Sequence, residues 1–113
     1  MTKQRALVIS DDPARKEYLF NELKSRGFYP VSYLNIFAYR KAVESDDFKI
    51  IVADLSMPIE PKLDIINRGA KKDPRPRLIT IGKYEYLKTL QVPLDPNVET
   101  LKTLKEFSTI MND

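Results

Sequence analysis

The sequence contains no cysteine and no histidine. Their absence excludes thiol chemistry, zinc sites of the usual kind and imidazole general-base catalysis. There is also no apolar run of about eighteen residues and no signal-peptide pattern, so we expect neither a membrane-spanning nor a secreted chain. A cytoplasmic location is the default expectation, and the missing cysteines agree with it.

Glycine is scarce, and nothing divides the chain into parts. The three Gly and eight Pro residues are scattered, so there is no linker or low-complexity segment. The chain has 113 residues, of which 42% are hydrophobic and 31% charged. This length and composition predict a single soluble domain over residues 1–113, with one core.

The net charge is +3, and five cations cluster near the middle of the chain: Arg68, Lys71, Lys72, Arg75 and Arg77. Such a cluster could meet an acidic partner or nucleic acid. A solvated helix end is the favoured interpretation, because cations suit a helix C-terminus and no aromatic residue interleaves. No base-reading helix is visible either, so we expect no direct nucleic-acid binding.

Three aspartates follow two short apolar runs. Residues 6–10 lead into Asp11 and Asp12, and residues 50–53 lead into Asp54. Runs of this kind are typical of strands buried on both faces. If the two strands are parallel neighbours, the carboxylates meet at the edge where open α/β folds bind ligands. Three acids there suggest a hard divalent cation bound by oxygen.

Strand and helix signals alternate along the chain. We expect strands over residues 5–10, 28–33, 50–54, 77–81 and 87–91. Helices are expected after Asp12, from Asn35, from Pro61 and from Asp95. The expected inward-facing residues include Leu19, Phe20, Leu23, Ile36, Phe37, Val43, Leu63, Ile66, Ala70, Val98, Leu101 and Leu104. The alternation predicts an α/β fold, a doubly wound parallel five-stranded sheet with helices on both faces.

On these residues the chain resembles the receiver domains of bacterial response regulators. The resemblance uses Asp11-Asp12, the run Asp54-Leu55-Ser56-Met57-Pro58, and Val92-Pro93 after the expected fifth strand. It implies the flavodoxin-like (CheY-like) receiver fold and two-component phosphorelay signalling. It also implies that Asp54 accepts a phosphoryl group from a histidine kinase or a small phosphodonor. The implied Mg²⁺ ligands are Asp11, Asp12, Asp54 and the backbone carbonyl of Ser56.

Three positions depart from the receiver pattern. Receivers end the fourth strand with Thr or Ser, but Ile81 stands there, and Thr80 one residue earlier points to the opposite face. Receivers place a Lys before the proline that follows the fifth strand, and this position is expected to fall on Val92. The switch aromatic, three residues before that Lys, is expected to fall on Thr89.

The expected fourth and fifth strands are separated by residues 82–86 only, whereas a helical crossover needs about a dozen residues. We therefore expect the fourth helix to be missing and the fifth strand to be parallel, joined by an extended strap. A hairpin is the alternative. Tyr84, Tyr86 and Leu87 are then candidates to cover the gap or to present a partner surface.

Two functional interpretations remain open, and neither is an enzyme. One is an atypical receiver that is phosphorylated on Asp54 with Mg²⁺. The other is a pseudo-receiver, a protein-interaction module that needs no phosphorylation. The expected partner is a histidine kinase or another signalling protein, and a homodimer is also open. A phosphohydrolase would need a second acid where Ser56 stands, and a flavodoxin-like cofactor site would need a Ser/Thr/Gly-rich loop after the first strand.

Overall fold

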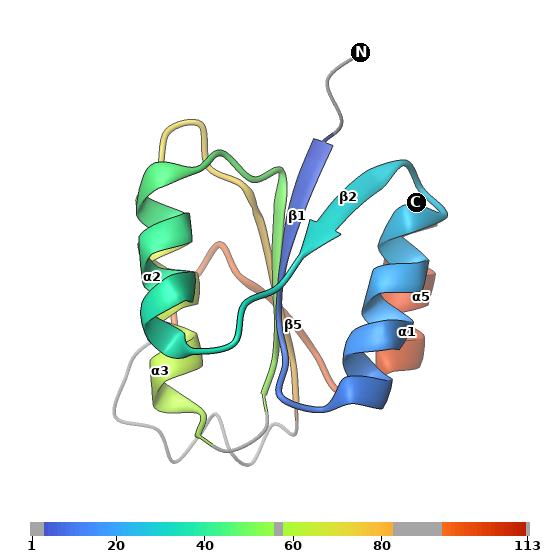
Figure 1. The fold of residues 1–113 in the computed structure, drawn as a ribbon. Coiled ribbons are helices and arrows are strands. Elements are labelled where there is room, and N and C mark those ends of the chain that lie inside the picture. Colours follow the sequence, from blue (N-terminus) through green and yellow to red (C-terminus); the bar gives the residue numbers. More distant parts are fainter. Residues whose placement is uncertain (1–3, 56–57, 83–93, 113) are drawn as a thin grey trace.

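The computed structural model describes residues 4–55, 58–82 and 94–112. Strands and helices alternate through this part of the chain (Figure 1). The strands are β1 (Gln4–Ile9), β2 (Phe28–Val31), β3 (Ile50–Asp54), β4 (Arg77–Ile81) and β5 (Glu99–Leu101). The helices are α1 (Pro13–Lys24), α2 (Ile36–Ser45), α3 (Glu60–Ala70) and α5 (Leu104–Ile110). No helix of the described residues is long and apolar enough to cross a membrane.

The five strands form one parallel sheet in the order β2-β1-β3-β4-β5. Helices α2 and α3 cover one face and α1 and α5 the other, which confirms the doubly wound fold (Figure 1). In β3, Ile51 and Ala53 face the first pair of helices, and Ile50 and Val52 face the second. By the same alternation Asp54 lies on the α1/α5 side of the sheet.

The starts of α1 and α2 follow from their capping residues, as predicted. The Asp12 carboxylate accepts hydrogen bonds from the Ala14 and Arg15 N–H groups, and Pro13 occupies the first helical position. The Asn35 side chain accepts from the Ala38 N–H at 2.9 Å. The predicted burial of Phe37 is wrong, because α2 turns Tyr39, Ala42 and Val43 inward and leaves Phe37 74% exposed.

The position predicted for the fifth strand is wrong. The strand that pairs with β4 is Glu99–Leu101, in parallel register, with Ile81 opposite Leu101. This strand is parallel to β4, as expected for the fifth strand, but residues 82–98 rather than a five-residue strap separate it from β4 in the sequence. The hairpin alternative concerned residues 87–91 and is not tested. Residues 83–93, on which the missing fourth helix and the strand over 87–91 were predicted, lie outside the described residues.

The last helix begins at Leu104, not after Asp95. Thr103 is its N-cap: its hydroxyl accepts from the Glu106 N–H at 3.2 Å, and the Glu106 carboxylate accepts from the Lys102 N–H at 3.4 Å. The second bond resembles half of a capping box, except that Glu106 binds the N–H of the residue before the cap rather than that of Thr103. Asp95 instead accepts from the Asn97 N–H at 2.9 Å, so its side chain stabilises a turn.

Candidate functional site

Asp54 ends β3 at the carboxyl edge of the sheet, and its side chain is buried with an exposed fraction of 2%. Both carboxylate oxygens accept hydrogen bonds from other side chains of the protein. Arg15 donates from Nε to Oδ2 and from Nη2 to Oδ1, each at 2.8 Å. The Ser10 hydroxyl donates to Oδ2 at 3.1 Å. The guanidinium and the carboxylate therefore form a bidentate pair, the strong geometry of an arginine–carboxylate interaction.

Arg15 reaches Asp54 because of where α1 begins. Asp12 caps the helix directly after β1, so the first turn of α1 lies at the same sheet edge as the end of β3. The hydrogen bond to Asp54 is the main cause that raises the pKa of Arg15 above its ordinary value, although partial burial opposes the shift. Arg15 is therefore a permanent cation beside Asp54.

Asp11 is paired with a second internal cation. Its carboxylate, 63% exposed, lies 2.7 Å from the Nζ atom of Lys62, a side chain of α3 that is almost fully buried. The third aspartate, Asp12, is occupied as the N-cap of α1. The three acids thus have three different partners: Arg15 for Asp54, Lys62 for Asp11 and backbone N–H groups for Asp12.

This arrangement leaves neither oxygen of Asp54 free for a divalent cation while Arg15 is in place. Within residues 4–55, 58–82 and 94–112, no group of three or more acidic side chains lies close enough to hold a metal. Both oxygens of Asp54 already accept charge-assisted hydrogen bonds, and the cations that balance Asp54 and Asp11 belong to the chain itself. Ser56, whose carbonyl was expected to complete the metal ligands, lies outside the described residues.

The β4 position opposite Asp54 is Ile81, which is fully buried. Thr80 points to the other face of the sheet, as the strand alternation predicts. Its hydroxyl is buried and has no hydrogen-bond partner in the structure as described. The structure therefore places no hydroxyl of β4 next to Asp54.

The residue that follows β5 is Lys102. The placement of the receiver lysine position at Val92 assumed a fifth strand over residues 87–91, which the structure does not describe. Lys102 is exposed, and Thr103 follows it where receivers have proline. Three residues earlier stands Glu99, which is paired with Arg77. Val92, Thr89 and the candidate partner surface of Tyr84, Tyr86 and Leu87 lie outside the described residues.

Sequence reasoning missed Ser10, Arg15, Lys62 and Lys102. A signal for two of them was present. Arg15 and Lys62 each fall in the first turn of a helix, where the helix dipole disfavours a cation. A cation in that position is a reason to look for a carboxylate near it, and both helices start where an aspartate-bearing strand ends.

No known family model matches the sequence, and no curated protein matches it. Solved structures do. The chain is similar to the response regulator TrrA of Thermotoga maritima in complex with Mg²⁺ and BeF, with a TM-score of 0.70, 21% identity and 96% of each chain covered. It is also similar to the magnesium-bound receiver domain of a sensor histidine kinase from Pseudomonas aeruginosa, with a TM-score of 0.72, 15% identity and coverage of 98% and 96%.

A third similar structure is a complex of the histidine kinase ThkA with TrrA, with a TM-score of 0.64, 20% identity and 96% of each chain covered. These likenesses show that the chain has the receiver fold of response regulators.

Proposed function

We propose that the protein is a cytoplasmic pseudo-receiver: a signalling module with the receiver fold that acts by binding a protein partner and has no metal-dependent phosphoryl switch at Asp54. One observation carries the proposal, the two-point contact of Arg15 with the Asp54 carboxylate. The similarity to a response regulator in complex with its histidine kinase supports a histidine kinase or another signalling protein as the partner.

The chemistry of phosphoryl acceptance explains why this contact matters. An aspartate accepts a phosphoryl group when one carboxylate oxygen attacks phosphorus while fixed positive charge stabilises the developing negative charge. In this chain the positive charge of Arg15 stabilises the Asp54 carboxylate itself, because Arg15 binds both of its oxygens, and this makes Asp54 a weaker nucleophile. Buried Ile81 offers no hydroxyl to bind the incoming phosphoryl oxygen.

A phosphorylated receiver is the second candidate, because Lys102 follows β5 at the same edge of the sheet as Asp54. Receivers place a lysine there to pair with the phosphoryl group. For this function, Arg15 would have to leave Asp54 before phosphoryl transfer.

Phosphorylation with acetyl phosphate and Mg²⁺, followed by intact-mass spectrometry, separates the two candidates. We expect no phosphoryl adduct on the wild-type protein. We expect Arg15→Met to acquire an adduct that Arg15→Met/Asp54→Asn lacks, whereas the neighbouring control Lys16→Met should remain unmodified. A wild-type adduct that disappears in Asp54→Asn would overturn the pseudo-receiver proposal and favour the phosphorylated receiver.

A further inference from the structure

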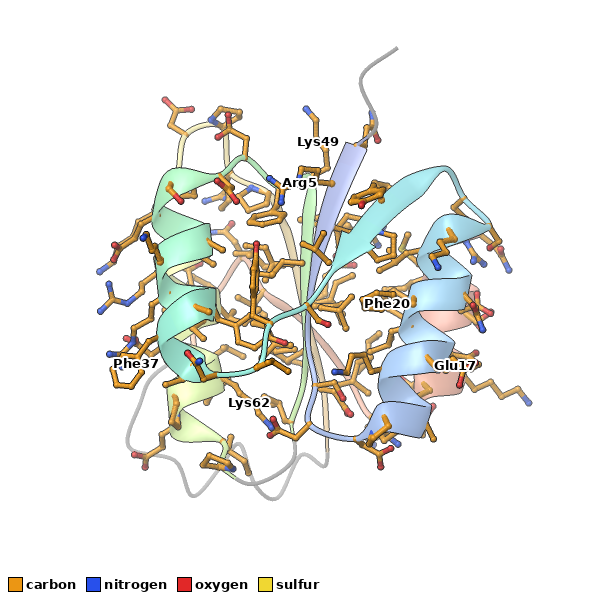
Figure 2. The ribbon with its side chains drawn as sticks, in the orientation of Figure 1. Arg5, Glu17, Phe20, Phe37, Lys49 and Lys62 are labelled. Atoms are coloured by element: carbon orange, nitrogen blue, oxygen red, sulfur yellow. The ribbon has the colours of Figure 1, made fainter. Side chains whose placement is uncertain are left out.

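Two large apolar side chains lie uncovered at the start of α2, near the site. Leu34 is fully exposed and Phe37 is 74% exposed, and Tyr29 is the only other exposed large apolar residue in the described part of the chain. Phe37 lies on the outer side of α2 in Figure 2, pointing away from the sheet. Burying a leucine or phenylalanine side chain is worth about 1.5–3 kcal/mol, so covering these two residues contributes favourable free energy to the binding of a partner.

A pocket of about 180 Å³ opens beside Leu34. Leu34, Ile36, Tyr39 and Pro61 contribute to its apolar lining, and Asp11 and Lys62 form its polar side. An apolar cavity of about 150 Å³ can hold a benzene ring, so this pocket has room for one leucine or phenylalanine side chain.

The charges around the pocket favour a cationic neighbour for that side chain. Lys62 is buried and bound to one oxygen of Asp11, while the Asp11 carboxylate remains 63% exposed. A lysine or arginine beside the inserted side chain would therefore meet the exposed part of the Asp11 carboxylate.

We propose that Leu34, Phe37 and this pocket bind a segment of a partner protein that inserts a leucine or phenylalanine and sets an adjacent lysine or arginine against Asp11. The proposal rests on the pseudo-receiver function and names the chemistry of its partner. Because Asp11 belongs both to the pocket and to the carboxyl edge of the sheet, such a partner contacts the site without any phosphoryl group.

An NMR titration of the ¹⁵N-labelled protein, without Mg²⁺ or phosphodonor, tests this docking. The probe is a blocked tetrapeptide with leucine and phenylalanine between two lysines, and its matched control has glutamates in place of the lysines. We expect the lysine peptide to move the amide signals of residues 34–37, Ile59, Glu60 and Lys62. It should bind roughly two- to fivefold more tightly than the glutamate peptide, the range of an exposed ion pair.

Three variants locate the contact. Asp11→Asn should remove the difference between the peptides, and Leu34→Ser should weaken the binding of both. Tyr29→Ser, which changes an exposed aromatic residue of β2, should leave binding intact.

Equal binding of both peptides, shifts confined to other residues, or no binding would overturn the proposal. So would concentration-dependent self-association that Leu34→Ser abolishes, since the occupant would then be a second copy. Phosphorylation of Asp54 would leave this result unaffected, so the two proposals fail separately.

Discussion

Asp11 and Asp12 are neighbours with the same side chain, yet the structure gives them different roles. Asp11 balances the charge of buried Lys62, and Asp12 satisfies backbone N–H groups at the start of α1. A shared metal site would make the two nearly equivalent. Comparing the effects of mutating Asp11 and Asp12 on stability therefore distinguishes internal pairing of these carboxylates from a shared metal site.

We expect Asp11→Asn to lower the free energy of unfolding by about 1–2 kcal/mol, because the Lys62 ammonium loses its carboxylate while remaining buried. Asp12→Asn should change it by only a few tenths of a kcal/mol, because asparagine caps a helix about as well as aspartate. Urea unfolding without added metal measures both. Equal losses for the two variants would contradict the pairing of Asp11 with Lys62.

At this scale the sequence predicted part of the site. The cap at Asp12 could be predicted because it depends on neighbours in the chain, Pro13 above all. The pairs Arg15–Asp54 and Lys62–Asp11 join residues far apart in the sequence, and their partners depend on how each helix lies over the sheet. Helix periodicity gives the face of a side chain but not the strand end that it reaches.

The elements of the N-terminal two thirds agree with the sequence, whereas the C-terminal third does not. Leu101 and Leu104 are three residues apart and fit a helical stripe, which is why a helix was predicted there. The N-cap at Thr103, whose hydroxyl accepts from the Glu106 N–H, places the helix start at Leu104 and leaves Glu99–Leu101 free to form β5. The capping residues, not the apolar spacing, decide this boundary.

A pH-dependent ion pair ties β5 to β4. Arg77 donates to Glu99 at 2.6 and 2.9 Å, and this hydrogen bonding lowers the pKa of Glu99 below its ordinary value. The pair therefore adds stability above the unfolded-state pKa of about 4.3, and the contribution is lost as the pH falls through the lower folded-state value. We expect Glu99→Gln to cost about 0.5 kcal/mol near neutral pH.

The measurement is urea unfolding of the wild type and Glu99→Gln at several pH values. The difference between the two proteins should begin to shrink as the pH falls below the unfolded-state pKa of about 4.3, and it should disappear below the lower folded-state pKa, where Glu99 is protonated in both states. A difference that stays constant down to low pH would show that Glu99 acts through packing rather than charge.

For the whole molecule, the sequence was sufficient to predict the parallel sheet. Consecutive apolar runs mark strands buried on both faces, and the helices between them require right-handed crossovers, which leaves few topologies. The sequence did not predict the electrostatic state of the carboxyl edge. That state depends on cations supplied by two helices on opposite faces of the sheet, α1 and α3.

Thermal unfolding with and without Mg²⁺ tests whether a metal ion binds at the carboxyl edge of the sheet. A site with a dissociation constant of about 1 mM would stabilise the fold by about 1.4 kcal/mol at about 10 mM Mg²⁺. For a domain of this size, that stabilisation corresponds to a rise in Tm of several degrees. We expect no rise relative to NaCl of matched ionic strength. A rise that Asp54→Asn abolishes would show that the metal displaces Arg15.

The contact between Arg15 and Asp54 also joins two layers of the molecule, since one residue comes from a covering helix and the other from a central strand. Whatever competes for the carboxylate must therefore loosen the beginning of α1 from the sheet. Faster amide hydrogen exchange in the first turn of α1 would then report that a ligand has bound to the buried Asp54 carboxylate.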